Sequence, residues 1–172
     1  DKRQGKTKTW YYGSGESIGN SASKSFSAYY RGAGMYKSTN GGSTWQNLSS
    51  TATLVSKTSE WDVIHAVAVD ASRNDSDIVY AALKSGIVRS NDGGSTWIHA
   101  LTASMDASFS NVMVSPTGVA YATISSNAGS GSGFWRSADG LNWSKITDSK
   151  FPGSHIRTVF DIAPSNENLL YF

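Results

Sequence analysis

Residues 86–97 read GIVRSNDGGSTW, and residues 34–45 carry a close copy, GMYKSTNGGSTW. A third and shorter copy, GFWRSADGLNW, covers residues 133–143. The copies end at Trp45, Trp97 and Trp143, so the repeat unit is about 50 residues long. A repeat of this length indicates a modular fold in which each unit packs against its neighbours.

The segments between the copies repeat as well. An apolar run, a polar turn and a run that contains tyrosine follow one another at 67–81, 112–122 and 160–171. Together with the copied stretch, each unit predicts four short antiparallel strands, which is the content of one propeller blade. No segment has the 3.6-residue period of an amphipathic helix.

We therefore expect an all-β fold, a β-propeller excerpt built of four-stranded antiparallel blades. Residues 1–172 are expected to form part of one propeller domain with two complete and two partial blades. The expected divisions are a partial blade at 1–50, blades at 51–103 and 104–149, and a partial blade at 150–172. Because such an arc exposes blade edges, we expect the remainder of the same propeller or a partner protein to cover them.

Composition excludes several classes of function. The chain has a formal net charge of +2 and 16% charged residues, which argues against a nucleic-acid-binding surface. It contains no cysteine, so disulfides and thiolate metal sites are excluded. No apolar run is long enough for a membrane span.

The copied stretch has the chemistry of a tight hairpin. In residues 90–97 the Asp92 carboxylate can accept hydrogen bonds from nearby backbone N–H groups, and the glycines supply positive φ angles. One carboxylate per turn falls short of the six to eight oxygen ligands that calcium prefers, so we predict a structural hairpin and no metal site. We also expect Trp45, Trp97 and Trp143 to be buried in equivalent places, and the cations Lys37, Arg89 and Arg136 to be solvated strand residues.

This hairpin resembles the Asp-box, or BNR repeat, of sialidase-like, sortilin-like and xyloglucanase-like β-propellers. The matching residues are Ser38, Asn40, Gly42 and Trp45; Ser90, Asp92, Gly94 and Trp97; and Ser137, Asp139 and Trp143. In these families the box lies between the third and fourth strands, so the resemblance implies a structural role away from the active face. The first 45 residues also resemble large secreted bacterial BNR-repeat proteins, many of which end in a type IX secretion sorting domain.

The enzymes in these families need more than the box. A sialidase-like site needs an arginine triad, and this chain lacks the arginines and the Phe-Arg-Ile-Pro segment for it. A xyloglucanase-like glycosidase needs two facing carboxylates, one of them held protonated. The catalytic candidates are Glu60, Asp62, Asp106 and Asp148, and no motif pairs them. The sequence predicts no cofactor.

One link between strands departs from the repeat. The link from Tyr12 to Gly34 is far longer than the equivalent links from Tyr80 to Gly86 and from Tyr121 to Gly133. Long loops on the rim of a propeller commonly carry ligand sites. Aromatic and arginine side chains there can stack on a sugar or anchor a protein. The candidate binding residues are Tyr29, Tyr30, Arg31 and Trp61, although these aromatics can equally serve to pin the loop to the blade.

The sequence thus favours a secreted or cell-surface propeller module for binding or scaffolding, with a glycan or the type IX secretion machinery as partner. The alternative is a propeller-type glycoside hydrolase acting on a polysaccharide. A sortilin-like receptor is disfavoured because no cysteine-rich segment follows within residues 1–172. Facing rim carboxylates, one with a raised pKa, would separate an enzyme from a binding module.

Overall fold

The computed structural model describes residues 1–17, 30–53, 59–104 and 106–172. The first sheet contains β1 (Trp10–Gly13), β2 (Met35–Ser38) and β3 (Gln46–Asn47). The second contains β4 (Ile64–Val69), β5 (Val79–Leu83), β6 (Gly86–Ser90) and β7 (Ile98–Thr102). The third contains β8 (Ser110–Val114), β9 (Ala120–Ile124), β10 (Gly133–Ser137) and β11 (Ser144–Ile146). The fourth pairs β12 (Asp161–Ile162) with β13 (Leu170–Tyr171).

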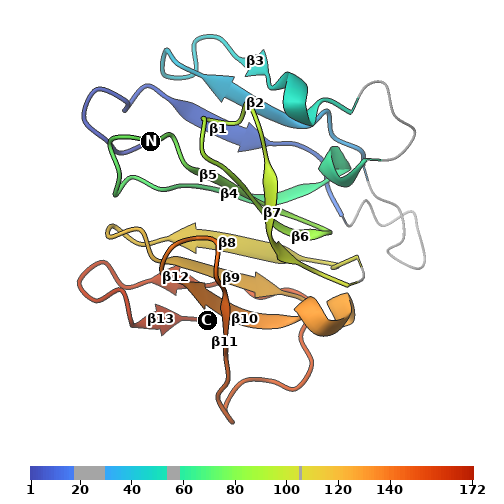
Figure 1. The fold of residues 1–172 in the computed structure, drawn as a ribbon. Helices are drawn as coiled ribbons and strands as arrows, with labels where there is room; N and C mark the ends of the chain where they lie inside the picture. Colours follow the sequence, from blue (N-terminus) through green and yellow to red (C-terminus); the bar gives the residue numbers. More distant parts are fainter. Residues whose placement is uncertain (18–29, 54–58, 105) are drawn as a thin grey trace.

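The predicted fold class is confirmed. Two four-stranded antiparallel sheets lie between a three-stranded and a two-stranded sheet, as expected for two complete and two partial propeller blades. Helical structure within the described residues is limited to three 3-10 segments, η1 (Ser49–Thr51), η2 (Glu60–Asp62) and η3 (Ser126–Gly131). The sheets follow one another in sequence order from the blue N-terminal sheet to the red C-terminal sheet (Figure 1).

The core consists of three apolar layers, one between each pair of neighbouring sheets. The layer between the first and second sheets includes Met35, Val79 and Leu83. The layer between the second and third sheets is built around Tyr80 and Ile124. The layer between the third and fourth sheets includes Phe160 and Ile162. β5 is buried along its whole length because its two faces belong to different layers. Burial on both faces explains its continuous apolar sequence, VYAAL.

Each of the first three sheets carries a tyrosine directly opposite a cation, in the pairs Tyr11–Lys37, Tyr80–Arg89 and Tyr121–Arg136. The cation lies over the tyrosine ring, at 5.3, 5.9 and 6.0 Å from the ring centre respectively. The expectation that these cations are solvated is wrong for Arg89, which is 7% exposed and donates from Nε to the Tyr80 hydroxyl at 3.2 Å.

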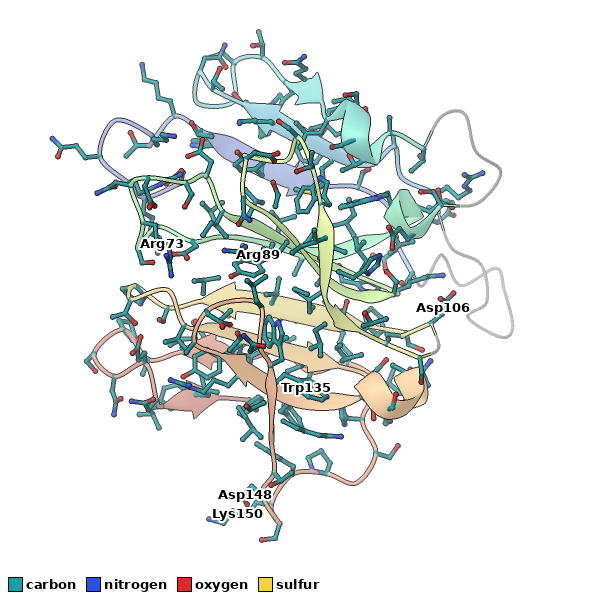
Figure 2. All side chains as sticks on the ribbon, viewed as in Figure 1. Arg73, Arg89, Asp106, Trp135, Asp148 and Lys150 are labelled. Atoms are coloured by element: carbon teal, nitrogen blue, oxygen red, sulfur yellow. The ribbon has the colours of Figure 1, made fainter. Side chains whose placement is uncertain are left out.

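These tyrosines also reach the next sheet. The Tyr11 hydroxyl donates to the Gly93 carbonyl at 3.3 Å, and the Tyr121 hydroxyl donates to the Glu167 carbonyl at 2.7 Å. The Tyr80 hydroxyl lies against Gly140, where an added Cβ atom would be only 1.8 Å away. The tyrosine–cation pair therefore joins each sheet to a turn of the following sheet. Figure 2 shows Arg89 where the second and third sheets meet.

The predicted hairpin network is present in residues 90–97. Asp92 accepts hydrogen bonds from the Ser90 hydroxyl at 2.8 Å and from the backbone N–H groups of Ser95 and Thr96 at 2.9 Å. Burial opposes ionisation of this carboxyl, but the hydrogen bonds from Thr96, Ser90 and Ser95 outweigh it and lower its pKa to about 2. In the third sheet the Asp139 carboxylate accepts the equivalent hydrogen bonds. In the first sheet the side chain of Asn40 takes the place of the carboxylate.

The expectation that the three tryptophans are buried in equivalent places is wrong, because two are half-buried and Trp45 is exposed. Trp97 packs against Trp61, with ring centres 5.0 Å apart, and Trp143 packs against the second sheet. Both rings are half-buried because each faces the sheet before its own. Trp45 is 38% exposed, since the described residues contain no sheet before the first.

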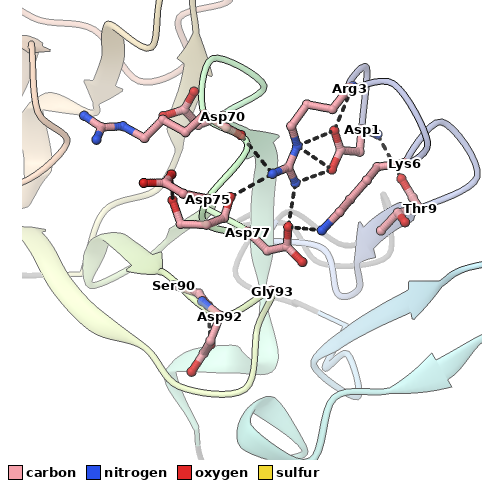
Figure 3. Close-up of polar contacts among 12 residues, drawn as sticks. Asp1, Arg3, Lys6, Thr9, Asp70, Asp75, Asp77, Ser90, Asp92 and Gly93 are labelled. Carbon is pink, nitrogen blue, oxygen red and sulfur yellow. Dashed lines mark hydrogen bonds and ion pairs between the residues drawn. The ribbon is translucent and has the colours of Figure 1, made fainter.

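The N-terminal segment is fastened to the turn between β4 and β5 (Figure 3). The buried Arg3 guanidinium donates to the carbonyls of Arg73 at 3.0 Å and Ser76 at 2.7 Å. It also pairs with the Asp1 and Asp77 carboxylates, and Lys6 adds a second ion pair to Asp77. Asp77 in turn accepts, through its carbonyl, the N–H of Gly93 at 2.8 Å. The segment thus braces the rim that carries the hairpins.

Candidate functional site

The two rims of the arc differ in content. The hairpins at 38–45, 90–97 and 137–143 form one rim, which we call the hairpin rim. The inner strands β4 and β8 begin at the opposite rim, which also carries η2 and η3, and we call this the pocket rim. The described residues contain no helix long and apolar enough to cross a membrane.

A pocket of about 240 Å³ lies on the pocket rim, where connections from all four sheets converge. β4 and β8 supply the floor through their first residues, since Ile64 and Ser110 open these strands. The segment after β1 and the segment before β12 supply the two sides. The lining residues are Gly15, Glu16, Ile64, His65, Phe109, Ser110, Asn111, Arg157, Thr158 and Val159.

His65 is the central polar residue of this pocket. Its Nδ1 lies 3.1 Å from the backbone nitrogen of Ser110 and 2.9 Å from the Ser110 hydroxyl oxygen. Its Nε2 lies 2.5 Å from the Ser17 hydroxyl oxygen, so both ring nitrogens have a hydrogen-bond partner. Burial, followed by the positive charge of Lys84, lowers the pKa of His65 to about 4. The ring is therefore neutral at pH 7, and it links the segment after β1 to the first strand of the third sheet.

Arg157 and Asn111 complete the polar lining. The Arg157 guanidinium lies over the Phe109 ring, 5.3 Å from its centre, and the His65 ring packs against the same phenyl group at 5.5 Å. Asn111 lines the pocket, and its side-chain carbonyl accepts the Val112 N–H at 2.8 Å. Hydrogen-bonding groups beside the apolar Ile64 and Phe109 side chains suit a polyhydroxylated ligand.

The predicted binding residues occupy different environments. Tyr29 lies outside the described residues. Tyr30 is 56% exposed, and its backbone pairs with that of Glu16. Arg31 forms a bidentate ion pair with Asp62, with Nε–Oδ2 and Nη2–Oδ1 distances of 3.0 Å each. Tyr30 thus presents an open ring, whereas Arg31 is tied to a carboxylate that is only 5% exposed.

Replacing Arg31 by Ala is expected to lower the free energy of unfolding by about 1 to 2 kcal/mol. The change leaves the Asp62 carboxylate without its cation, and part exposure of the Arg31 side chain moderates the loss. Chemical denaturation of the wild type and the variant measures the effect. Arg73→Ala, at an exposed turn, is the control, and an equal loss in both variants would contradict a structural role for the ion pair.

Trp61 lies in the core and not on the rim surface. It is 7% exposed and its ring packs against Trp97, so the expectation of an accessible aromatic beside the long loop does not match its position. The sequence Ser-Glu-Trp-Asp forms the 3-10 turn η2, which is closed by a capping box. The side chain of Ser59 accepts from the backbone of Asp62, and the side chain of Asp62 accepts from the backbone of Ser59. This turn directs Trp61 inward.

The four candidate carboxylates are spread over the arc. Glu60 accepts the Ser85 hydroxyl at 2.8 Å and lies 3.3 Å from His99 Nε2, and Asp62 is held by Arg31. Asp148 accepts the Lys150 N–H at 2.8 Å in a local turn, and Figure 2 shows it far from Asp106. Within the described residues, no group of three or more metal-ligating side chains is close enough together to hold an ion.

The sequence did not single out His65, Phe109 or Arg157. Each lies at or just before the start of an inner strand, in segments that are far apart in the chain. Alignment of the repeats could have found these residues, because the first residues of equivalent inner strands lie at the same rim of a propeller.

A pH effect is expected from His65. Its pKa is about 4 in the folded protein against 6.5 for an ordinary histidine, so the unfolded chain binds the proton more readily. The stability it contributes is complete above pH 6.5 and is lost as the pH falls through 4. Urea midpoints at pH 7 and pH 4.5 should therefore differ less in His65→Asn than in the wild type. An identical difference in both would contradict a buried, neutral His65.

The fold has counterparts among solved structures, whereas no protein-family model and no curated protein matches the chain. A GH74 enzyme from Niastella koreensis matches with a TM-score of 0.57 and 26% identity over 80% of this chain and 21% of that one. The GH74 xyloglucanase from Xanthomonas campestris matches with a TM-score of 0.61 and 19% identity, over 96% of this chain and 24% of that one. The chain thus spans about a quarter or less of these β-propeller enzymes.

Proposed function

We propose that this chain is the polysaccharide-binding arc of an extracellular β-propeller protein. The observation that carries the proposal is the pocket on the pocket rim, which combines apolar side chains with a neutral histidine, an amide and a cation. Sugars are bound by such mixtures, because their hydroxyl groups need hydrogen-bond partners while their C–H faces pack on apolar groups. The likeness to GH74 enzymes supports a glycan as the ligand class.

The location outside the cell and a role as type IX secretion cargo belong to the same proposal. The polarity of this chain comes from Ser, Thr, Gly and Asn, and the resemblance of its first residues to secreted BNR-repeat proteins supports export. The partner for the open blade edges is proposed to be further propeller structure, because the exposed Trp45 occupies the position at which Trp97 packs in the layer between the first and second sheets.

Hydrolysis of a polysaccharide is the second candidate, favoured by the GH74 likeness. An inverting or retaining glycosidase needs a facing pair of carboxyl groups. Among the described residues, Asp62 is neutralised by Arg31 and Asp148 serves its own turn, so neither supplies such a pair. Catalysis would therefore need a facing pair of carboxyl groups other than Asp62 and Asp148, with this arc holding part of the substrate.

Binding to a panel of soluble polysaccharides that includes xyloglucan and polygalacturonate tests the proposal. The chain is expected to bind at least one of them, and Asn111→Ala is expected to weaken that binding about fivefold, the loss of one hydrogen bond. Asn74→Ala, in the exposed turn between β4 and β5, is the matched control. Absence of binding to every polysaccharide, or equal binding by both variants, would contradict the proposal.

A further inference from the structure

The polar groups of the pocket that lack partners are hydrogen-bond donors. Within the described residues, the Arg157 guanidinium forms no hydrogen bond and no ion pair, and its ring contact is with Phe109. The Asn111 amide nitrogen is also without a partner there, because only its carbonyl oxygen is engaged. Arg157 is exposed and Asn111 is half-buried, so water satisfies these donors in the free protein, and a ligand rich in acceptors can replace that water.

Arg157 differs in this respect from Arg3, Arg31 and Arg89, whereas Arg136 also lies over a ring, that of Tyr121. Arg3 and Arg31 are held by carboxylates, and Arg89 is held by a tyrosine hydroxyl. Packing on Phe109 restricts the Arg157 side chain while leaving all five of its N–H donors available. A planar guanidinium in this state matches a carboxylate, which it can bind through two parallel hydrogen bonds.

The charges around the pocket are arranged in two halves. Lys84 and Arg157 are close enough to disfavour protonation of His65, whereas Glu16 favours it. Glu16 belongs to the segment after β1, and Arg157 belongs to the segment before β12, so the anion and the cation line opposite sides. His65 stays neutral between them. A ligand that fits both sides has an anionic group near Arg157 and hydroxyl donors near Glu16.

We propose that this pocket binds a uronic acid residue of an acidic polysaccharide, with the carboxylate on Arg157 and the ring hydroxyls on Glu16 and Asn111. The inference rests on the proposed polysaccharide-binding function and narrows its ligand class. Uronates carry a carboxylate and several hydroxyls on one ring, so a single residue satisfies both halves of the pocket.

Titration calorimetry with polygalacturonate oligosaccharides at low ionic strength tests this assignment on the whole chain. Two neutral probes accompany them, the same oligosaccharides with reduced carboxyl groups and a xyloglucan oligosaccharide. Arg157→Gln removes the charge and keeps donors, and Arg73→Gln removes an exposed arginine from the opposite rim. The expected result is at least tenfold weaker binding of polygalacturonate by Arg157→Gln, no change in Arg73→Gln, and weaker binding of the reduced probe by the wild type.

The outcomes separate this inference from the proposed function. Equal binding of the native and reduced oligosaccharides, or unchanged binding by Arg157→Gln, would overturn the uronate assignment. Binding of xyloglucan alone would also overturn it, yet would leave the proposed function standing. Failure to bind any of the three probes would overturn both. A polygalacturonate affinity that falls equally in the Arg157 and Arg73 variants would show attraction by overall charge and no site.

Discussion

Tyr80→Ala is expected to lower the free energy of unfolding by about 3 to 5 kcal/mol, the range for removing a large core ring. Tyr80 is 1% exposed and lies in the apolar layer between the second and third sheets. Its hydroxyl accepts a hydrogen bond from Arg89, which is itself buried, so the variant also leaves a guanidinium without a partner. The loss measures how strongly these two sheets are joined.

Tyr80→Phe is the matched control, since it keeps the ring and removes only the hydroxyl. We expect it to cost about 1 kcal/mol. Equilibrium unfolding in urea, followed by tryptophan fluorescence, gives both values. Equal losses in the two variants would show that the Tyr80 ring does not pack between the sheets.

Gly140→Ala is expected to destabilise the protein by about 2 to 4 kcal/mol, through backbone strain and overpacking together. Gly140 lies in the hairpin of the third sheet with a φ of 73°, and an added Cβ atom would lie 1.8 Å from the Tyr80 hydroxyl oxygen. The hydroxyl is the end of a rigid, buried ring, so it cannot move aside cheaply.

Gly41→Ala separates strain from crowding. Gly41 has a nearly equal φ of 72°, but the nearest atom to an added Cβ is 3.9 Å away on the Lys8 side chain. We expect this control to lose only about 1 kcal/mol, the penalty of a left-handed backbone for a residue with a Cβ atom. Similar unfolding midpoints for the two variants would contradict close contact between the hairpin of the third sheet and Tyr80.

The sequence was sufficient for the fold class, because the evidence lay within each repeat. The spacing of Trp45, Trp97 and Trp143 and the run from Ser90 to Trp97 specify strands and turns that form locally. The hydrogen bonds to Asp92 involve only the next few residues, so the sequence pattern predicts them directly. Local structure of this kind depends little on how the sheets are stacked.

Features that depend on stacking were predicted less well. Arg89 is buried because the third sheet covers it, and Trp45 is exposed because no described sheet lies on its side. Arg89 has the same repeat position as Lys37 and Arg136, and Trp45 has the same position as Trp97 and Trp143, yet the burial of these residues differs. Burial here depends on which sheet is the neighbour, and the sequence of one blade does not contain that information.

The candidate site illustrates the same limit. Glu16, His65, Asn111 and Arg157 come together only when the inner strands of successive sheets converge at the pocket rim. The long link after β1 did direct attention to this rim, and Glu16 and Tyr30 lie on it. Its aromatic and basic character alone gave no indication that Arg31 pairs with the buried Asp62.

Hydrogen exchange with and without bound oligosaccharide is the most direct test of the claim that the pocket rim binds a glycan while the hairpin rim is structural. The experiment uses xyloglucan or polygalacturonate oligosaccharides at saturating concentration and compares amide protection along the chain. We predict slower exchange at the starts of β4 and β8 and around Arg157, with no change in the hairpins at 90–97 and 137–143. Protection confined to the hairpins, with the starts of β4 and β8 unaffected, would contradict the assignment of the two rims.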